Sequence, residues 1–405
     1  MIPFGSLNIS PIEGVTVFST IRKPALLRIY LLPLVLILAT NMTGSIDILY
    51  SLDLGANVFQ VNLINTIQRT MSILFLVPFG FLSDRFGRKP MLLLSRSLII
   101  VGTIIRVVAS NPDHLIIAAF TGGFAGGGFF PLILSMLADV AEPDELHEAI
   151  STMYIFSSIG MLIGPTISSS LLTLPQVSLR NLYQINAILQ LGLLVYIVAQ
   201  IGETRPESSN NEKGNLSVHL SELMHQRNFQ NLLVLGCLYF FSMAIINTYI
   251  PIFARMDLNL TDSEIASFSI FRSLAILAIR VLSATMLAKL PIKPFLTSVI
   301  VLGGITRFVS PLANDYPALV MVLFASGISY GATAILGNTL VAMNSARENR
   351  GAANSLYNLS SSLGSIMLIF TTSLAETQGL TPVFIIGGIA AFMSILPMFI
   401  PRKQG

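Results

Sequence analysis

Residues 25–46 read ALLRIYLLPLVLILATNMTGSI, a continuous apolar run in which Arg28 is the single charged residue. A helix that crosses the ~30 Å hydrocarbon core of a bilayer needs about 20 mainly apolar residues. Eleven further runs of similar length follow, so the sequence predicts an all-α integral membrane protein with twelve transmembrane helices. These runs lie at about 58–81, 90–110, 114–138, 148–173, 182–202, 230–253, 264–287, 294–313, 317–343, 352–374 and 381–400.

The composition supports a membrane protein. Charged residues make up 11% of the 405 residues, hydrophobic residues make up 53%, and the mean hydropathy is +0.76. A soluble chain would carry about 25% charged residues, and a chain of this length has too little interior to hide the surplus of apolar side chains. We therefore expect the lipid bilayer as a partner and a multi-pass location in the plasma membrane. The small net charge of +3 gives no reason to expect nucleic acid.

Residues that would support an enzyme or a metal site are scarce. One cysteine, Cys237, lies in an apolar run, which excludes a disulfide framework or a cysteine metal site. The four histidines have no metal-ligand spacing with carboxylates, and the sequence contains no recognisable nucleophile–base pair or phosphate-binding loop. We predict no enzymatic activity, no metal and no cofactor.

Basic residues indicate the orientation in the membrane. When alternate breaks between the apolar runs are assigned to one side, fourteen Lys and Arg residues fall on that side, and only Arg180 and Arg255 fall on the other. Positive residues stay cytoplasmic, so both termini are predicted to be cytoplasmic. The expected organisation is a cytoplasmic segment 1–24, a six-helix bundle 25–202, a cytoplasmic linker 203–229, a second six-helix bundle 230–400 and a cytoplasmic tail 401–405.

The two halves resemble each other at a single offset of 204 residues. Lys89-Pro90 falls on Lys293-Pro294, Gly123 on Gly327, Gly127 on Gly331, and residues 157–160 on residues 361–364. Two similar bundles can rock about a site near the bilayer midplane, which is how many secondary transporters expose a solute to each side in turn. The duplication therefore favours a transporter, expected to act as a monomer.

The loop between the second and third runs reads Gly80-Phe81-Leu82-Ser83-Asp84-Arg85-Phe86-Gly87-Arg88-Lys89-Pro90. It resembles the G-x-L-x-D-R-x-G-R-[KR] loop of the major facilitator superfamily. That resemblance, which extends over the whole chain, implies a secondary active transporter that moves a small solute by alternating access. It also implies a cytoplasmic latch between the halves, with Asp139 as an acidic partner. The residues of the loop assigned to this latch are Gly80, Asp84, Arg85, Gly87, Arg88 and Lys89.

Two glycine motifs suggest an efflux antiporter. Gly123 and Gly127 lie in the fourth run, and Gly160, Gly164 and Pro165 lie in the fifth, where they resemble a motif of the family's exporters. The arginine that usually precedes the first of these motifs is Ala119 here, which argues against proton antiport. Protons or another coupling ion therefore stay open as partners.

Charged residues inside the membrane need a reason because each costs about 2.5–3.5 kcal/mol on insertion scales. Arg28, Arg96, Arg106 and Arg280 are near enough to an interface to extend towards it. Arg69 and Arg272 are deep, with no carboxylate at comparable depth, which favours an anionic solute. Structural hydrogen bonds are the alternative for both. The cavity-lining residues expected to bind the solute are Asn41, Asp47, Arg69, Asn247, Arg272, Tyr330 and Asn338.

Three functions therefore stay open. The first is a small-solute transporter, with an efflux antiporter as its finer form, and the second is an anion carrier that uses Arg69 and Arg272. The third is a membrane sensor or lipid scramblase with the same fold and no solute cycle. The intact loop between Gly80 and Pro90 argues against the third, because a fixed receptor needs no latch.

Overall fold

The computed structural model describes residues 19–142, 144–205, 224, 226–286, 291–345 and 350–399, and all regular secondary structure in these residues is helical. The predicted segments 1–24, 203–229 and 401–405 lie wholly or mostly outside them. The first half contains η1 (Ser19–Arg22), α1 (Pro24–Gly44), α2 (Asp47–Asp53), α3 (Val58–Phe86), α4 (Arg88–Val108), α5 (Pro112–Gly126), α6 (Phe129–Val140), α7 (Leu146–Leu171) and α8 (Leu179–Gln200). The second half contains α10 (Arg227–Met256), α11 (Asp262–Met286), α12 (Ile292–Val309), η2 (Ser310–Leu312), α13 (Tyr316–Met343), α14 (Arg350–Ile366), η4 (Met367–Thr371), α15 (Thr372–Gln378), α16 (Leu380–Met393) and α17 (Leu396–Phe399).

The predicted all-α membrane architecture is confirmed, with a smaller count of clearly apolar spans. Among the described residues, ten helices are long and apolar enough to cross a membrane, and the two parts of α3, bent by 45° next to Pro78, add an eleventh. The predicted span 352–374 does not qualify. It is broken into α14, η4 and α15, and α14 is rich in serine and asparagine.

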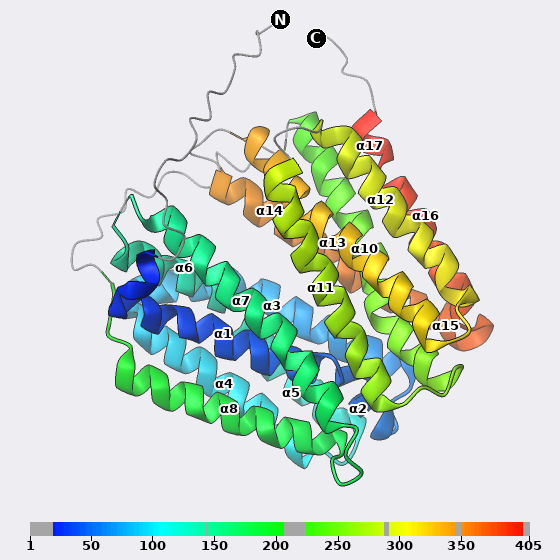
Figure 1. The fold of residues 1–405 in the computed structure, drawn as a ribbon, viewed down its shortest axis with the longest axis horizontal. Helices are drawn as coiled ribbons and strands as arrows, with labels where there is room; N and C mark the ends of the chain where they lie inside the picture. Colours follow the sequence, from blue (N-terminus) through cyan, green and yellow to red (C-terminus); the bar gives the residue numbers. More distant parts are fainter. Residues whose placement is uncertain are drawn as a thin grey trace, which may run out of the picture.

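The helices gather into two groups, one from each half of the sequence. Figure 1 shows α1 to α8 on one side of the molecule and α10 to α17 on the other, with α7 and α11 running next to each other where the groups meet. Each group has its own buried apolar cluster, one around Phe129 and Met136 and the other around Phe229 and Tyr357. A third cluster, which includes Tyr50 and Tyr249, joins both groups at one end.

Glycines allow α7 to lie directly on α1. A Cβ atom built on Gly160 would lie 2.5 Å from the carbonyl oxygen of Leu34, and one built on Gly164 would lie 2.4 Å from that of Leu38. Both distances are far shorter than a van der Waals contact. Small residues four positions apart let helix backbones approach closely in membranes. The helix continues through Pro165 to Leu171.

The offset of 204 residues reappears in the helix contacts. Gly123 lies on the backbone of Gln68, and Gly327 lies on the backbone of Arg272. Gly123 and Gln68 lie 204 residues before Gly327 and Arg272, respectively. The structural counterpart of Arg272 is therefore Gln68, and Arg69 is one position away from the symmetric place.

Polar contacts join the halves near one end of the molecule. Arg255, at the end of α10, forms a 2.7 Å ion pair with Asp53, at the end of α2. Asn62 of α3 donates 2.8 Å hydrogen bonds to Tyr249 and Thr372. The predicted orientation places these contacts on the outer side of the membrane.

At the opposite end the halves diverge. A cavity of about 840 Å³ lies between α7, α11 and α13, and its walls include Tyr154, Leu162, Leu277, Arg280 and Asn338. Tyr154 is near the start of α7, whereas Arg280 and Asn338 are near the ends of their helices. The structure is therefore closed between the predicted outer ends and open between the predicted cytoplasmic ends.

The contact between α1 and α7 gives a stability prediction. Gly164→Ala should lower the free energy of unfolding by about 1–3 kcal/mol, because the added methyl group overpacks the contact. The measurement is the melting temperature of the purified protein. Gly192→Ala in α8 is the matched control, since a Cβ there has no neighbour within 4 Å and should leave the melting temperature equal or raised. Equal effects of the two variants would contradict the prediction.

Candidate functional site

The loop between α3 and α4 is organised around the side chain of Arg88. Its guanidinium forms ion pairs with Asp84 at 2.6 Å and with Asp139 at 3.2 Å, and it donates a 2.8 Å hydrogen bond to Ser83. Asp139 lies near the end of α6, so Arg88 joins the adjacent ends of α3, α4 and α6. These partners all belong to the first half.

The carboxylate of Glu203 covers the N-terminus of α4. It accepts hydrogen bonds from the backbone N–H groups of Arg88 (2.8 Å), Lys89 (3.2 Å), Thr204 and Arg205 (both 3.0 Å). An anion at this place is favoured by the free N–H groups and by the helix dipole. Burial alone would raise the pKa of Glu203, but the four N–H donors outweigh it and hold the pKa below its ordinary value.

Gly87 is required between these two helices. Its φ angle is +104°, in the region that favours glycine, and a Cβ atom there would lie 2.4 Å from a carboxylate oxygen of Glu203. Glycine is therefore the residue that fits this turn, and Glu203 is the neighbour that the motif did not reveal. Gly80 has no such neighbour, because no atom lies within 4 Å of a Cβ built on it. In this open arrangement no helix approaches it.

The remaining basic residues of the loop lie on its surface. Arg85 is 5.5 Å from the ring of Phe86, and its carbonyl oxygen accepts a 2.8 Å hydrogen bond from Arg205. The ammonium group of Lys89 donates to the carbonyl oxygen of Val198 at 3.0 Å. The loop is thus attached to α8 and to the start of the chain that leads to the second half.

A polar cavity of about 250 Å³ lies between the halves, further from the open end. Its walls include Asp47, Arg69, Asn247 and Arg272, so it brings together four of the seven predicted binding residues. Arg272 donates a hydrogen bond to the amide oxygen of Asn247, and its guanidinium carbon is 5.2 Å from the centre of the Tyr330 ring. Its Nε has no hydrogen-bond partner among the described residues. The structure therefore places both deep arginines at one cavity, with a free donor on Arg272.

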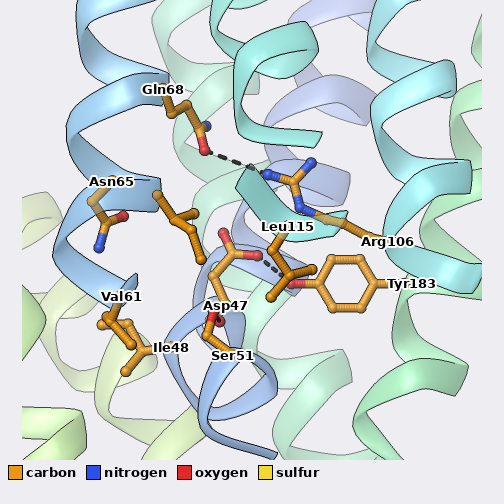
Figure 2. A pocket seen from close by; sticks show the side chains of 10 residues that line it. Asp47, Ile48, Ser51, Val61, Asn65, Gln68, Arg106, Leu115 and Tyr183 are labelled. Carbon is orange, nitrogen blue, oxygen red and sulfur yellow. Dashed lines mark hydrogen bonds between the residues drawn. The ribbon is translucent and has the colours of Figure 1, made fainter. Parts of the chain in front are cut away.

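The position of Asp47 corrects one premise of the sequence analysis. No carboxylate was expected at the depth of the two arginines, yet Asp47 lines the same cavity. The reason is a break in the first span: α1 ends at Gly44, and Asp47 begins the separate helix α2. Figure 2 shows the carboxylate of Asp47 facing Tyr183, which donates a hydrogen bond to it, with Arg106 nearby. Tyr183 and Gln68 were not predicted, because their spacing carries no signal.

The prediction that Arg96 and Arg106 extend to the membrane interface is wrong. Arg96 is 0% exposed, and its guanidinium lies 4.5 Å from the centre of the Phe129 ring. Arg106 points to the interior of the first half, where it donates a 3.5 Å hydrogen bond to Gln68 (Figure 2). Both side chains lie on the face of α4 that packs inward. The same prediction is consistent with Arg28, which is exposed, and with Arg280, which is partly exposed at the larger cavity near the end of α11.

Two predicted binding residues lie apart from the central cavity. Asn41 donates a hydrogen bond to the carbonyl oxygen of Ile37 in its own helix, at 2.9 Å. Asn338 lines the larger cavity near the open end. The central group therefore consists of Asp47, Arg69, Asn247 and Arg272, with Tyr330 stacked on the last.

Comparisons with known proteins agree on the kind of protein that this chain resembles. A family model described as "Major Facilitator Superfamily" matches residues 29–364 and, in an overlapping second match, residues 274–405. Among curated proteins, "MFS-type transporter sphD" of Aspergillus fumigatus is 35% identical over 88 residues, which are 22% of this chain and 15% of that protein. "Efflux pump dotC" of Dothistroma septosporum is 41% identical over 61 residues, which are 15% of this chain and 10% of that protein.

The arrangement of helices is also shared with solved structures. The crystal structure of the nucleoside transporter NupG matches with a TM-score of 0.81 over 93% of this chain and 100% of that chain. The two sequences are only 12% identical, so this likeness concerns the fold alone.

The cap at the start of α4 gives a second prediction. Because the folded pKa of Glu203 is lowered, its stabilising effect is present above the ordinary value of 4.5 and is lost as pH falls through the lower folded value. Glu203→Ala should cost about 1 kcal/mol at pH 7, the usual loss for a helix cap. The melting temperatures of the wild type and the Glu203→Ala variant, measured from pH 7 downward, should converge below about pH 4.5. A constant difference across that range would contradict the prediction.

Proposed function

This chain belongs to the Major Facilitator Superfamily, and we propose that it is a secondary active transporter that moves a small solute across the membrane by alternating access. The observation that supports this proposal is the central polar cavity, which lies between two helix groups that meet at one end and diverge at the other. A cavity in this place can face each side of the membrane in turn when the groups rock.

The charges around the central cavity favour a solute with an anionic group. Arg69 and Arg272 contribute two positive charges and Asp47 contributes one negative charge. A monovalent anion would balance the remaining charge, and the free Nε of Arg272 could donate to it. Asn247 already holds the other side of that guanidinium, which orients the free donor. We therefore propose that Asp47, Arg69, Asn247 and Arg272 form a binding site for an anionic solute.

Asp47 is also our candidate for coupling. It is the one carboxylate among the residues that line the central cavity, and it lies beside both arginines. A carboxylate that alternates between the two sides can accept a proton or bind a cation on one side and release it on the other. We assign this role to Asp47, with protons as the first coupling ion to examine.

Efflux of a more hydrophobic compound is the second candidate. The larger cavity near the open end is lined by apolar side chains, among them Ile155, Leu162 and Leu277. The glycine motif of α7 resembles that of exporters, and one curated relative is named an efflux pump. A sensor or scramblase remains the candidate from another class. The plasma membrane location, the cytoplasmic termini and the monomeric state stay proposals as well.

Alternating access can be tested by locking the closed end. The hydroxyl oxygens of Ser169 and Ser263 are 3.4 Å apart, across the contact between α7 and α11, so a pair of cysteines there could form a disulfide. In a Cys237→Ser background, oxidation of Ser169→Cys with Ser263→Cys should reduce solute flux into proteoliposomes at least tenfold. Reductant should restore the flux. Each single variant is a control, and unchanged flux after complete cross-linking would overturn the transport proposal.

The proposed anion-binding site in the central cavity can be tested without a transport assay. A thermal-shift screen of the purified protein against metabolites, inorganic anions and drugs at two pH values should find anions that raise the melting temperature. Arg69→Gln and Arg272→Gln should each remove most of that increase, because the site loses one of its two positive charges. Arg28→Gln, on the exposed face of α1, is the matched control. Stabilisation that persists in both cavity variants would exclude an anion at this site.

A further inference from the structure

A second polar cavity lies inside the first half, away from the interface between the halves. Its volume is about 240 Å³, and α1, α4, α5, α6 and α8 contribute to its walls. Arg96, Arg106, Asn186 and Gln190 line it, and Asp47 separates it from the central cavity. Liquid water occupies about 30 Å³ per molecule, so the space is roughly that of eight waters or of a small ion with part of its hydration shell.

Arg96 is the unusual feature of this cavity. Its side chain is 0% exposed, and only its Nη2 has a hydrogen bond, at 2.9 Å to Ser95. In the described part of the chain, neither its Nε nor its Nη1 has a hydrogen-bond partner. A buried cation with free donors is costly unless an anion or water meets them. The ring of Phe129 covers one face of the guanidinium and leaves its edge to the cavity.

The charge of the cavity is not balanced by the protein. Arg96 and Arg106 are positive, Asp47 is negative, and Tyr183 is the other titratable side chain on the wall. Asp47 accepts its hydrogen bond from Tyr183, and no ion pair joins it to Arg96 among the described residues. Asp47 also lines the central cavity, so even when its whole charge is counted here at least one positive charge is left over, which a monovalent anion would offset.

We infer that this cavity is a binding site for a small monovalent inorganic anion, with chloride as the model ligand, and that Arg96 is its main ligand. The Nε and Nη1 groups of Arg96 donate to the anion. The amide oxygens of Asn186 and Gln190, which also have no hydrogen-bond partner among the described residues, hold waters that complete its shell. This site shares Asp47 with the proposed solute site, but its main ligand, Arg96, does not line that site, and anion binding here does not depend on transport.

Binding of radioactive chloride to the purified full-length protein tests this inference. The wild type should bind about one ion per chain, and Arg96→Gln should weaken binding at least tenfold. Arg307→Gln is the matched control, because Arg307 is an arginine of the second half that is also 0% exposed but lies elsewhere. Loss of chloride binding in Arg272→Gln, with Arg96→Gln unaffected, would place the anion in the central cavity and overturn the inference.

A second measurement covers the case in which Arg96→Gln does not fold. Crystals of the wild-type protein grown in bromide should show anomalous density within hydrogen-bond distance of Arg96. Replacing chloride with gluconate at constant ionic strength should lower the melting temperature by several degrees, since a hydroxylated organic carboxylate does not replace a small spherical halide at the donors of Arg96. Bromide density that is absent from this cavity would overturn the inference, as would a melting temperature that does not respond to chloride.

Discussion

A guanidinium group cannot face hydrocarbon without a large loss of hydration free energy, and this constraint organises the interior of the protein. The chain carries several arginines within apolar helices. The structure buries Arg307 inside the second half and places four others at two polar cavities. Arg69 and Arg272 line the cavity between the halves, whereas Arg96 and Arg106 line a cavity inside the first half. Each polar space is enclosed by helices that bury their apolar faces against one another.

Close helix contacts keep these spaces narrow. Gly123 and Gly127 bring α5 and its continuation onto α3, and Gly160 and Gly164 bring α7 onto α1. Because the backbones touch at these points, we expect neighbouring helices within a half to move together. At the boundary between the halves a small set of polar contacts, such as the pair of Asp53 and Arg255, holds one end closed. Such contacts are easier to break than a glycine-packed interface.

The parts of the structure that depend on local sequence were predictable. Apolar run lengths located the spans, and the offset of 204 residues anticipated matching contacts at Gly123 and Gly327. Depth along a helix also identified Arg69 and Arg272. The sequence could not show which face of α4 packs inward, so Arg96 and Arg106 were assigned to the interface. The break after Gly44 was missed as well, because an apolar run does not reveal where a helix bends, and this hid the role of Asp47. Glu203 meets Arg88 across more than a hundred residues, with no spacing to indicate it.

The attachment of Glu203 has a mechanical consequence. Glu203 accepts a hydrogen bond from the turn at Gly87, and Arg205 donates one to the carbonyl oxygen of Arg85. The segment that follows α8 is therefore held against the start of α4 as well as by α8 itself. The chain therefore leaves the first group beside the turn that joins α3 and α4, at the end where the two groups diverge. Because residues 203–205 are held at the turn around Gly87, any movement of the first group carries along the point at which the chain leaves it.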